Sequence, residues 1–156
     1  MTRQTEIALV GLCLALAGCL PPLDSDGQQA LAIARMPAEE AQRAINKLSP
    51  DKQVDVYLAG GTQVEPPLML QGYLAPNWRA VLPVVKARLA SASSARVFEL
   101  SNLLLIISQN FCSLAERDDV LSAVSAAGPR AGPYRTSVEE DLKKILQPAK
   151  KLPTCQ

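Results

Sequence analysis

The chain has 156 residues, with 16 basic and 15 acidic side chains and a formal net charge of +1. This balance, without a long run of one sign, gives a nucleic acid no electrostatic reason to bind. Histidine is absent, which excludes Ser-His-Asp and Cys-His catalysis and the usual histidine ligation of zinc or haem. We therefore expect neither a metal nor a cofactor.

A short apolar stretch follows Arg3 and runs from Ile7 to Ala17. A transmembrane helix needs about 20 apolar residues, so this stretch fits the core of a secretory signal instead. It closes with Leu16-Ala17-Gly18-Cys19, which resembles the lipobox of bacterial lipoproteins. The resemblance implies that residues 1–18 are a signal peptide. It also implies that Cys19 carries the lipid, palmitate included, and begins the mature protein.

The residue after Cys19 is leucine and not aspartate. In lipoproteins of the enterobacterial type, aspartate at that position retains the protein in the inner membrane. The resemblance therefore implies an outer-membrane lipoprotein that faces the periplasm. The alternative is ordinary signal peptidase cleavage, because Ala15-Leu16-Ala17 also fits the small-x-small pattern. That cleavage would release a soluble protein beginning at Gly18.

The four cysteines can be assigned by parity. Cys13 would be lost with the leader and Cys19 would be consumed by acylation, which leaves Cys112 and Cys155. Disulfides persist in an oxidising compartment, so we expect these two to form one. On loop-entropy grounds the bridge would stabilise the fold by about 4 kcal/mol. The alternative is two free thiols.

The region that follows the lipobox predicts a tether and then one domain. Residues 20–27 contain two prolines, two aspartates and a glycine, a composition typical of a disordered linker. We expect residues 19–35 to be the acylated cysteine and a flexible tether, although residues 28–36 are apolar enough for a weak helix. Residues 36–156 are then a single helical domain.

Helix signals recur along that domain. Ser49 and Ser113 are predicted N-caps, the second in a capping box with Glu116, and Thr136 or Ser137 is expected to cap the last helix. Pro83 lies inside an apolar pattern of helical spacing and predicts a kink. The helices are expected at about residues 37–48, 50–60, 66–74, 77–89, 95–111, 114–127 and 137–147.

These signals, together with an aromatic content of only 4%, predict an all-α fold. Short helices joined by tight turns suggest an antiparallel array of about six short helices, with the apolar segment 95–111 as its most buried element. The pattern is loosely similar to two or three HEAT-type hairpins. A compact irregular bundle is the alternative.

Acidic side chains are the only residual sign of enzymatic chemistry. A cell-wall hydrolase would need two carboxyl groups facing each other across a cleft. The residues considered are Glu39, Glu99, Asp118 and Asp119. Solvated helix surface is the interpretation that we favour for them, and Glu99 is expected to pair with Arg96 or Arg79. We therefore assign no catalytic residue.

Two groups of residues are considered for partner binding. Tyr73 and Trp78 bracket the tight Pro76-Asn77 connection and could form an aromatic anchor, although Trp78 could equally be a core residue. The other group is Arg130, Tyr134 and Arg135, in a loop rich in glycine and proline, which could also be a bare connector.

The sequence thus suggests a membrane-anchored, non-catalytic lipoprotein that binds a protein partner or assists envelope assembly. One alternative is an immunity or exclusion lipoprotein that binds a toxin or a competitor's factor. The other is a cell-wall hydrolase that uses the acidic side chains.

Overall fold

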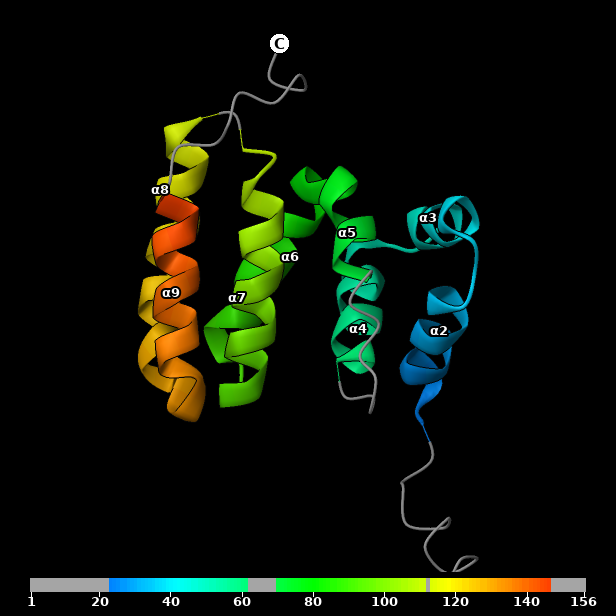
Figure 1. The fold of residues 1–156 in the computed structure, drawn as a ribbon, viewed down its shortest axis with the longest axis horizontal. Coiled ribbons are helices and arrows are strands. Elements are labelled where there is room, and N and C mark those ends of the chain that lie inside the picture. Colours follow the sequence, from blue (N-terminus) through cyan, green and yellow to red (C-terminus); the bar gives the residue numbers. More distant parts are fainter. Residues whose placement is uncertain (1–22, 62–69, 112, 147–156) are drawn as a thin grey trace, which may run out of the picture.

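The computed structural model describes residues 23–61, 70–111 and 113–146, and within these it is all-α, with no strand (Figure 1). No helix in this part of the chain is long and apolar enough to cross a membrane. Two short 3-10 segments, η1 (Ala75–Asn77) and η2 (Gly128–Tyr134), accompany the α-helices. The α-helices are α2 (Ser25–Ala34), α3 (Ala38–Asn46), α4 (Pro50–Gly60), α5 (Leu70–Leu74), α6 (Trp78–Ser91), α7 (Ser94–Ser108), α8 (Leu114–Ala127) and α9 (Arg135–Leu146).

The helices form a stack of four antiparallel hairpins. In a first row, α2 packs on α4, α4 on α6 and α6 on α8; in a second row, α3 packs on α5, α5 on α7 and α7 on α9. Figure 1 shows α9 in front of α8 and α7 in front of α6, with the four hairpins succeeding one another along the long axis. Each hairpin therefore contacts mainly its neighbours, as in helical repeat proteins. The expected antiparallel array is confirmed, in its hairpin form.

The core follows α7, as its all-round apolar sequence predicts. Its buried residues include Leu100, Leu103, Leu104 and Ile107, each at most 1% exposed. Burying one leucine or isoleucine side chain stabilises a fold by about 2 to 3 kcal/mol. Helix α7 contacts α5, α6, α8, α9 and η2, and it therefore joins the central and C-terminal hairpins.

Local sequence signals fix the N-termini of α4 and α8. The Ser49 side chain accepts a hydrogen bond from the Lys52 amide, and Pro50 occupies the first turn of α4. Ser113 and Glu116 form the expected capping box at the start of α8. These contacts satisfy amide groups that a helix N-terminus leaves without partners. The predicted N-caps at Ser49 and Ser113 are confirmed.

The expectation of a flexible tether through residue 35 is wrong from Ser25 onward. Helix α2 occupies Ser25–Ala34 and packs on α4, with Ala30 and Ile33 buried in the core. The Asp24 carboxylate caps it by accepting a hydrogen bond from the Gly27 amide at 2.7 Å. Aspartates that suggest a linker serve here as a helix cap and first turn. The domain boundary therefore moves from residue 36 to about residue 24.

The C-terminal helix also differs from the prediction. It begins at Arg135, directly after η2, so neither Thr136 nor Ser137 is its cap. Gly132 makes a bend inside η2, with a φ of 57° that favours glycine. The ion pairs on α9 join Arg135 to Glu139 and Lys144 to Asp141.

Candidate functional site

A charged cleft of about 440 Å³ opens where the first hairpin meets the turn between α6 and α7. One wall carries acidic groups from α2 and α4, and the other carries guanidinium groups from α6 and α7. Apolar and small side chains form the floor. The lining residues are Asp24, Asp26, Asp55, Leu58, Ala59, Arg88, Ser91, Ala92, Ser93, Arg96 and Leu100.

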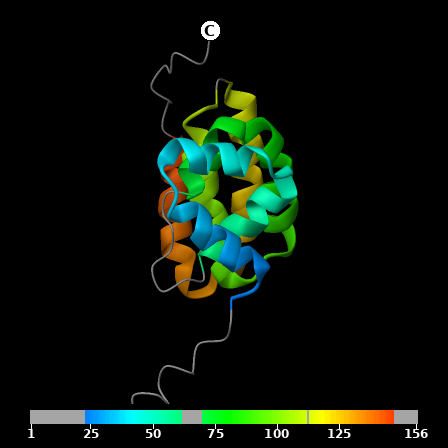
Figure 2. The ribbon, with the colours of Figure 1, turned by 90° about the vertical axis from the view of Figure 1, so that its right-hand side faces the viewer.

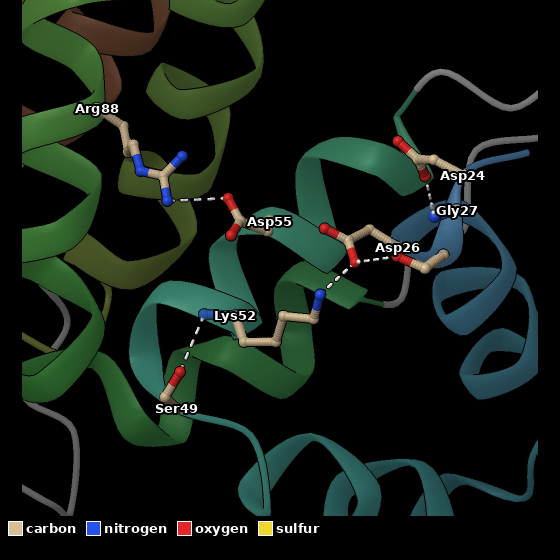
Figure 3. Close-up of polar contacts among 8 residues, drawn as sticks. Asp24, Asp26, Gly27, Ser49, Lys52, Asp55 and Arg88 are labelled. Carbon is tan, nitrogen blue, oxygen red and sulfur yellow. Dashed lines mark hydrogen bonds and ion pairs between the residues drawn. The ribbon is translucent and has the colours of Figure 1, made fainter.

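The acidic wall is held in place by hydrogen bonds. Asp24 caps α2, and Asp26, one residue into the same helix, forms an ion pair with Lys52 of α4 (Figure 3). The hydrogen bond from Lys52 lowers the pKa of Asp26, and Asp26 therefore stays ionised in neutral solution. A general acid needs the opposite shift, because it must hold its proton until it protonates a leaving group.

Arg88 of the basic wall forms an ion pair with Asp55 of the acidic wall. A guanidinium nitrogen of Arg88 lies 2.9 Å from a carboxylate oxygen of Asp55 and 3.8 Å from one of Asp51. Figure 3 shows the Arg88 side chain reaching from α6 toward Asp55 on α4. The side chain of Arg88 remains 42% exposed, so it can contact a partner without losing its ion pair.

Arg96 ties α7 to the end of α4. It donates a hydrogen bond to the Leu58 carbonyl and a second, at 2.7 Å, to the Glu99 carboxylate. The Tyr57 hydroxyl donates to the Glu99 backbone carbonyl at 2.8 Å, and burial raises the pKa of Tyr57. The expected pairing of Glu99 with Arg96 is confirmed.

Ion pairs link each helix of the first row to the next. Asp26 of α2 pairs with Lys52 of α4, Asp55 of α4 with Arg88 of α6, and Lys86 of α6 with Asp119 of α8. We call the outer surface that carries these pairs the charged face. The charged cleft lies in it, between α2, α4 and α6.

Neither aromatic residue proposed as an anchor forms an exposed patch. Trp78 is only 6% exposed and packs on Phe111 with ring centroids 5.0 Å apart. The Arg79 guanidinium carbon covers the same ring at 4.5 Å. Tyr73 is half-buried, and its backbone carbonyl accepts a hydrogen bond from Gln42 of α3. The alternative assignment of Trp78 to the core is confirmed.

The residues of the glycine-rich segment are exposed but have internal contacts. Arg130 donates to the backbone carbonyls of Leu89 at 2.7 Å and Ala92 at 3.1 Å, which closes the C-terminal end of α6. The Tyr134 ring stacks on Phe98 at 5.2 Å, and Arg135 pairs with Glu139. The segment is therefore a structured connection whose outer surface remains open to a partner.

The acidic residues considered for hydrolysis do not assemble into one cleft. Glu39 lies on α3, Glu99 on α7, and Asp118 and Asp119 on α8, and none of the four lines the charged cleft. Asp119 pairs with Lys86. Among the described residues, no three Cys, Asp or Glu side chains lie close enough together to hold a metal ion.

Cys19, Cys112 and Cys155 lie outside the described residues, so the lipid attachment and the disulfide stay predictions. No family model, no curated protein and no solved structure matches this chain. Its function therefore has to be argued from its own residues.

Sequence reasoning missed the charged cleft because its residues come from four separate helices. One signal was available: Asp24, followed by an acidic residue at position 26 and by the helix-forming residues 28–32, fits the pattern of an N-cap with an acidic first turn. Recognising that cap would have placed α2 in the fold and Asp26 on its first turn. The pairing of Asp55 with Arg88 depends on the stacking of α4 on α6, which no local pattern indicates.

Proposed function

We propose that the protein is an envelope lipoprotein, anchored through Cys19 and facing the periplasm, that binds a protein partner without catalysis. The observation that carries this proposal is the charged face, with its cleft between two hairpins. A surface of alternating acidic and basic groups matches a polypeptide that carries both signs of charge. Helical hairpin stacks characteristically bind partners along such extended faces.

The state of the charged groups supports binding over catalysis. Each acidic and basic residue of the face is held by an ion pair or a hydrogen bond, which fixes the charge pattern before a partner arrives. The hydrogen bond from Lys52 lowers the pKa of the cleft carboxylate Asp26. A glycoside hydrolase would instead need one carboxyl group with a raised pKa.

Site-specific photocrosslinking in intact cells tests this proposal. Ala87 is exposed on α6, between Lys86 and Arg88, so a photoreactive residue there would touch a partner seated on the charged face. Lys143, exposed on α9 of the second row, is the matched control. We expect one discrete protein adduct from position 87 and much less from position 143. Equal adducts from both positions, or none from position 87, would contradict the proposal.

A charge variant tests whether the cation at Arg88 contributes to partner binding. Arg88→Gln keeps a polar side chain at this position but removes the cation that faces Asp55. We expect the adduct from position 87 to fall several-fold in this variant, because electrostatic complementarity governs specificity and encounter rate. Lys143→Gln should leave the yield unchanged.

The competing enzymatic hypothesis has its own test. Purified protein is applied to a peptidoglycan zymogram alongside Glu99→Gln. Clearing by the natural protein that disappears in the variant would establish a hydrolase. The proposal predicts that neither protein clears the gel.

A further inference from the structure

We infer that one edge of the stack lies against the bilayer, with η2 as a second membrane contact besides the lipid. This inference rests on the proposed anchoring through Cys19. The lower edge, named for its place in Figure 1, consists of Asp24, the end of α4, the turn at residues 91–93, and η2. Figures 1 and 2 both show the start of α2, the α6–α7 turn and the start of α9 at this end of the molecule.

The first argument is the length of the connection. Helix α2 belongs to the folded body from its cap at Asp24 onward. Ala30 and Ile33 are buried in the core, and Asp26 forms an ion pair with Lys52. Four residues, 20–23, therefore lie between the lipid-bearing Cys19 and Asp24, which are five Cα–Cα steps apart. A fully extended chain of that length spans at most about 17 Å. The end of the molecule that carries Asp24 is thus held close to the membrane surface.

The second argument is the composition of the rest of that edge. Residues 128–138 contain two arginines and one tyrosine and no acidic residue. Tyr134 is 40% exposed and the Arg135 side chain is 63% exposed. Tyrosine and arginine are the side chains that suit a membrane surface, since one presents an aromatic body and a polar tip and the other binds phosphate.

The third argument is the rigidity of the segment. The Tyr134 ring stacks on Phe98 with an interplanar angle of 18°. The Ser94 hydroxyl donates to the Arg130 carbonyl at 2.8 Å. The Arg130 guanidinium in turn donates to the Leu89 carbonyl near the end of α6. A fixed segment loses little conformational freedom when it meets the headgroups.

Because the lipid already holds the protein at the membrane, a weak contact between η2 and the bilayer is sufficient to orient the molecule. Once the lipid is inserted, η2 meets the bilayer in an intramolecular event, at a high effective concentration. The turn at residues 91–93 between α2 and η2 is uncharged and small, so nothing on it repels the surface. In this orientation the charged cleft, which Asp24 and the turn at residues 91–93 line, opens at the membrane-facing edge. The ion pairs of Arg88 with Asp55 and of Lys86 with Asp119, on the outer surface of the first row, stay open to a periplasmic partner.

Lipid photocrosslinking tests the orientation. The full-length mature protein, with its native lipid, is reconstituted into vesicles of phosphatidylethanolamine and phosphatidylglycerol. A photoreactive phenylalanine replaces Tyr134 in one variant and Leu114 in the control. Leu114 begins α8 at the opposite end of the same hairpin and is 74% exposed. It is thus the more exposed of the two residues, and apolar as well.

We expect several-fold more phospholipid adduct from position 134 than from position 114. Arg135→Gln should lower the adduct from position 134 in vesicles that contain phosphatidylglycerol. Equal yields from the two positions, or a higher yield from position 114, would overturn the inference. Mass analysis of the N-terminal peptide separates the two claims: an unmodified N-terminus would refute the anchoring itself. An acylated Cys19 with equal yields would refute only the orientation.

Discussion

Arg96 and Arg130 perform the same task at two successive levels of the stack. Each donates to backbone carbonyls at the C-terminal end of a first-row helix, Arg96 to Leu58 of α4 and Arg130 to Leu89 of α6. Carbonyls at a helix C-terminus have no partner within the helix, and a cation there also complements the helix dipole. These two side chains therefore close helix ends and join consecutive hairpins.

Replacing Arg130 by alanine tests this role. Two hydrogen bonds to backbone carbonyls are lost, so we expect the free energy of unfolding to fall by about 1 to 2 kcal/mol. Urea denaturation followed by circular dichroism measures the change. The control is Arg135→Ala, which removes an exposed ion pair with Glu139 and should change stability by no more than about 0.5 kcal/mol. Equal effects of the two substitutions would refute the capping role.

Tyr57 makes stability sensitive to alkaline pH. Burial raises its pKa, whereas in the unfolded chain a tyrosine titrates near its ordinary value of about 10. The stabilisation is therefore present below pH 10 and is lost as the pH rises above it, because the unfolded state alone then releases the proton. We expect Tyr57→Phe to abolish this alkaline loss in urea denaturation at graded pH. An unchanged profile in this variant would contradict the assignment, and Tyr134→Phe serves as the control.

The contacts of single residues differ in how far the sequence predicts them. The pairing of Glu99 with Arg96 is predictable because residues three apart lie side by side on a helix. The role of Arg130 is not, since its acceptors belong to a helix that ends 39 residues earlier in the chain, at Ser91. Trp78 shows a third case, because an aromatic residue beside apolar helical positions can be either a core residue or an exposed anchor for a partner. Its packing against Phe111 shows that it belongs to the core.

Helix α2 shows how local composition can mislead at the scale of an element. The prolines and aspartates in and before its first turn suggest a linker, yet burial of Ala30 and Ile33 against α4 stabilises the helix. Tertiary packing commonly overrides weak local propensity. By contrast, the capping box at Ser113 was predictable because every contact that forms it lies within four residues.

A substitution inside α2 separates a folded element from a tether. Ile33 is 2% exposed, and truncation of a buried isoleucine to alanine costs about 2 to 4 kcal/mol. We expect Ile33→Ala to lower the free energy of unfolding by that amount in urea denaturation. Ala32→Gln, on the exposed side of the same helix, should have almost no effect. If Ile33→Ala is also neutral, residues 25–34 do not contribute to the fold.

The bend within η2 depends on one glycine. Gly132 has a φ of 57°, and a Cβ there would meet the Ser94 hydroxyl at 3.1 Å. We expect Gly132→Ala to destabilise the fold by about 1 to 2 kcal/mol, because an L-residue is strained in the left-handed region. Gly72→Ala has open space around its Cβ and should be neutral or slightly stabilising. Differential scanning calorimetry of the two variants gives the comparison, and equal melting temperatures would contradict the strain argument.

At the scale of the whole molecule, the all-α class of the fold could be predicted from the sequence, but the charged cleft could not. Low aromatic content and recurrent caps indicate helices, and short connections indicate antiparallel neighbours. The two-row stacking arises from contacts between alternate helices, such as α7 with α9, which no local pattern encodes. The charged cleft lies between such neighbours, so it emerges only with the assembled stack.

The central claim is that Cys19 anchors this helical stack to a membrane. Its most direct test is mass spectrometry of the mature N-terminus, combined with detergent-phase partition of the natural protein and of Cys19→Ser. We predict that the natural chain begins with a diacylglyceryl-modified Cys19 and enters the detergent phase. The serine variant should lack the lipid and leave that phase. An unmodified chain that begins at Gly18, or a serine variant that partitions like the natural protein, would contradict the claim.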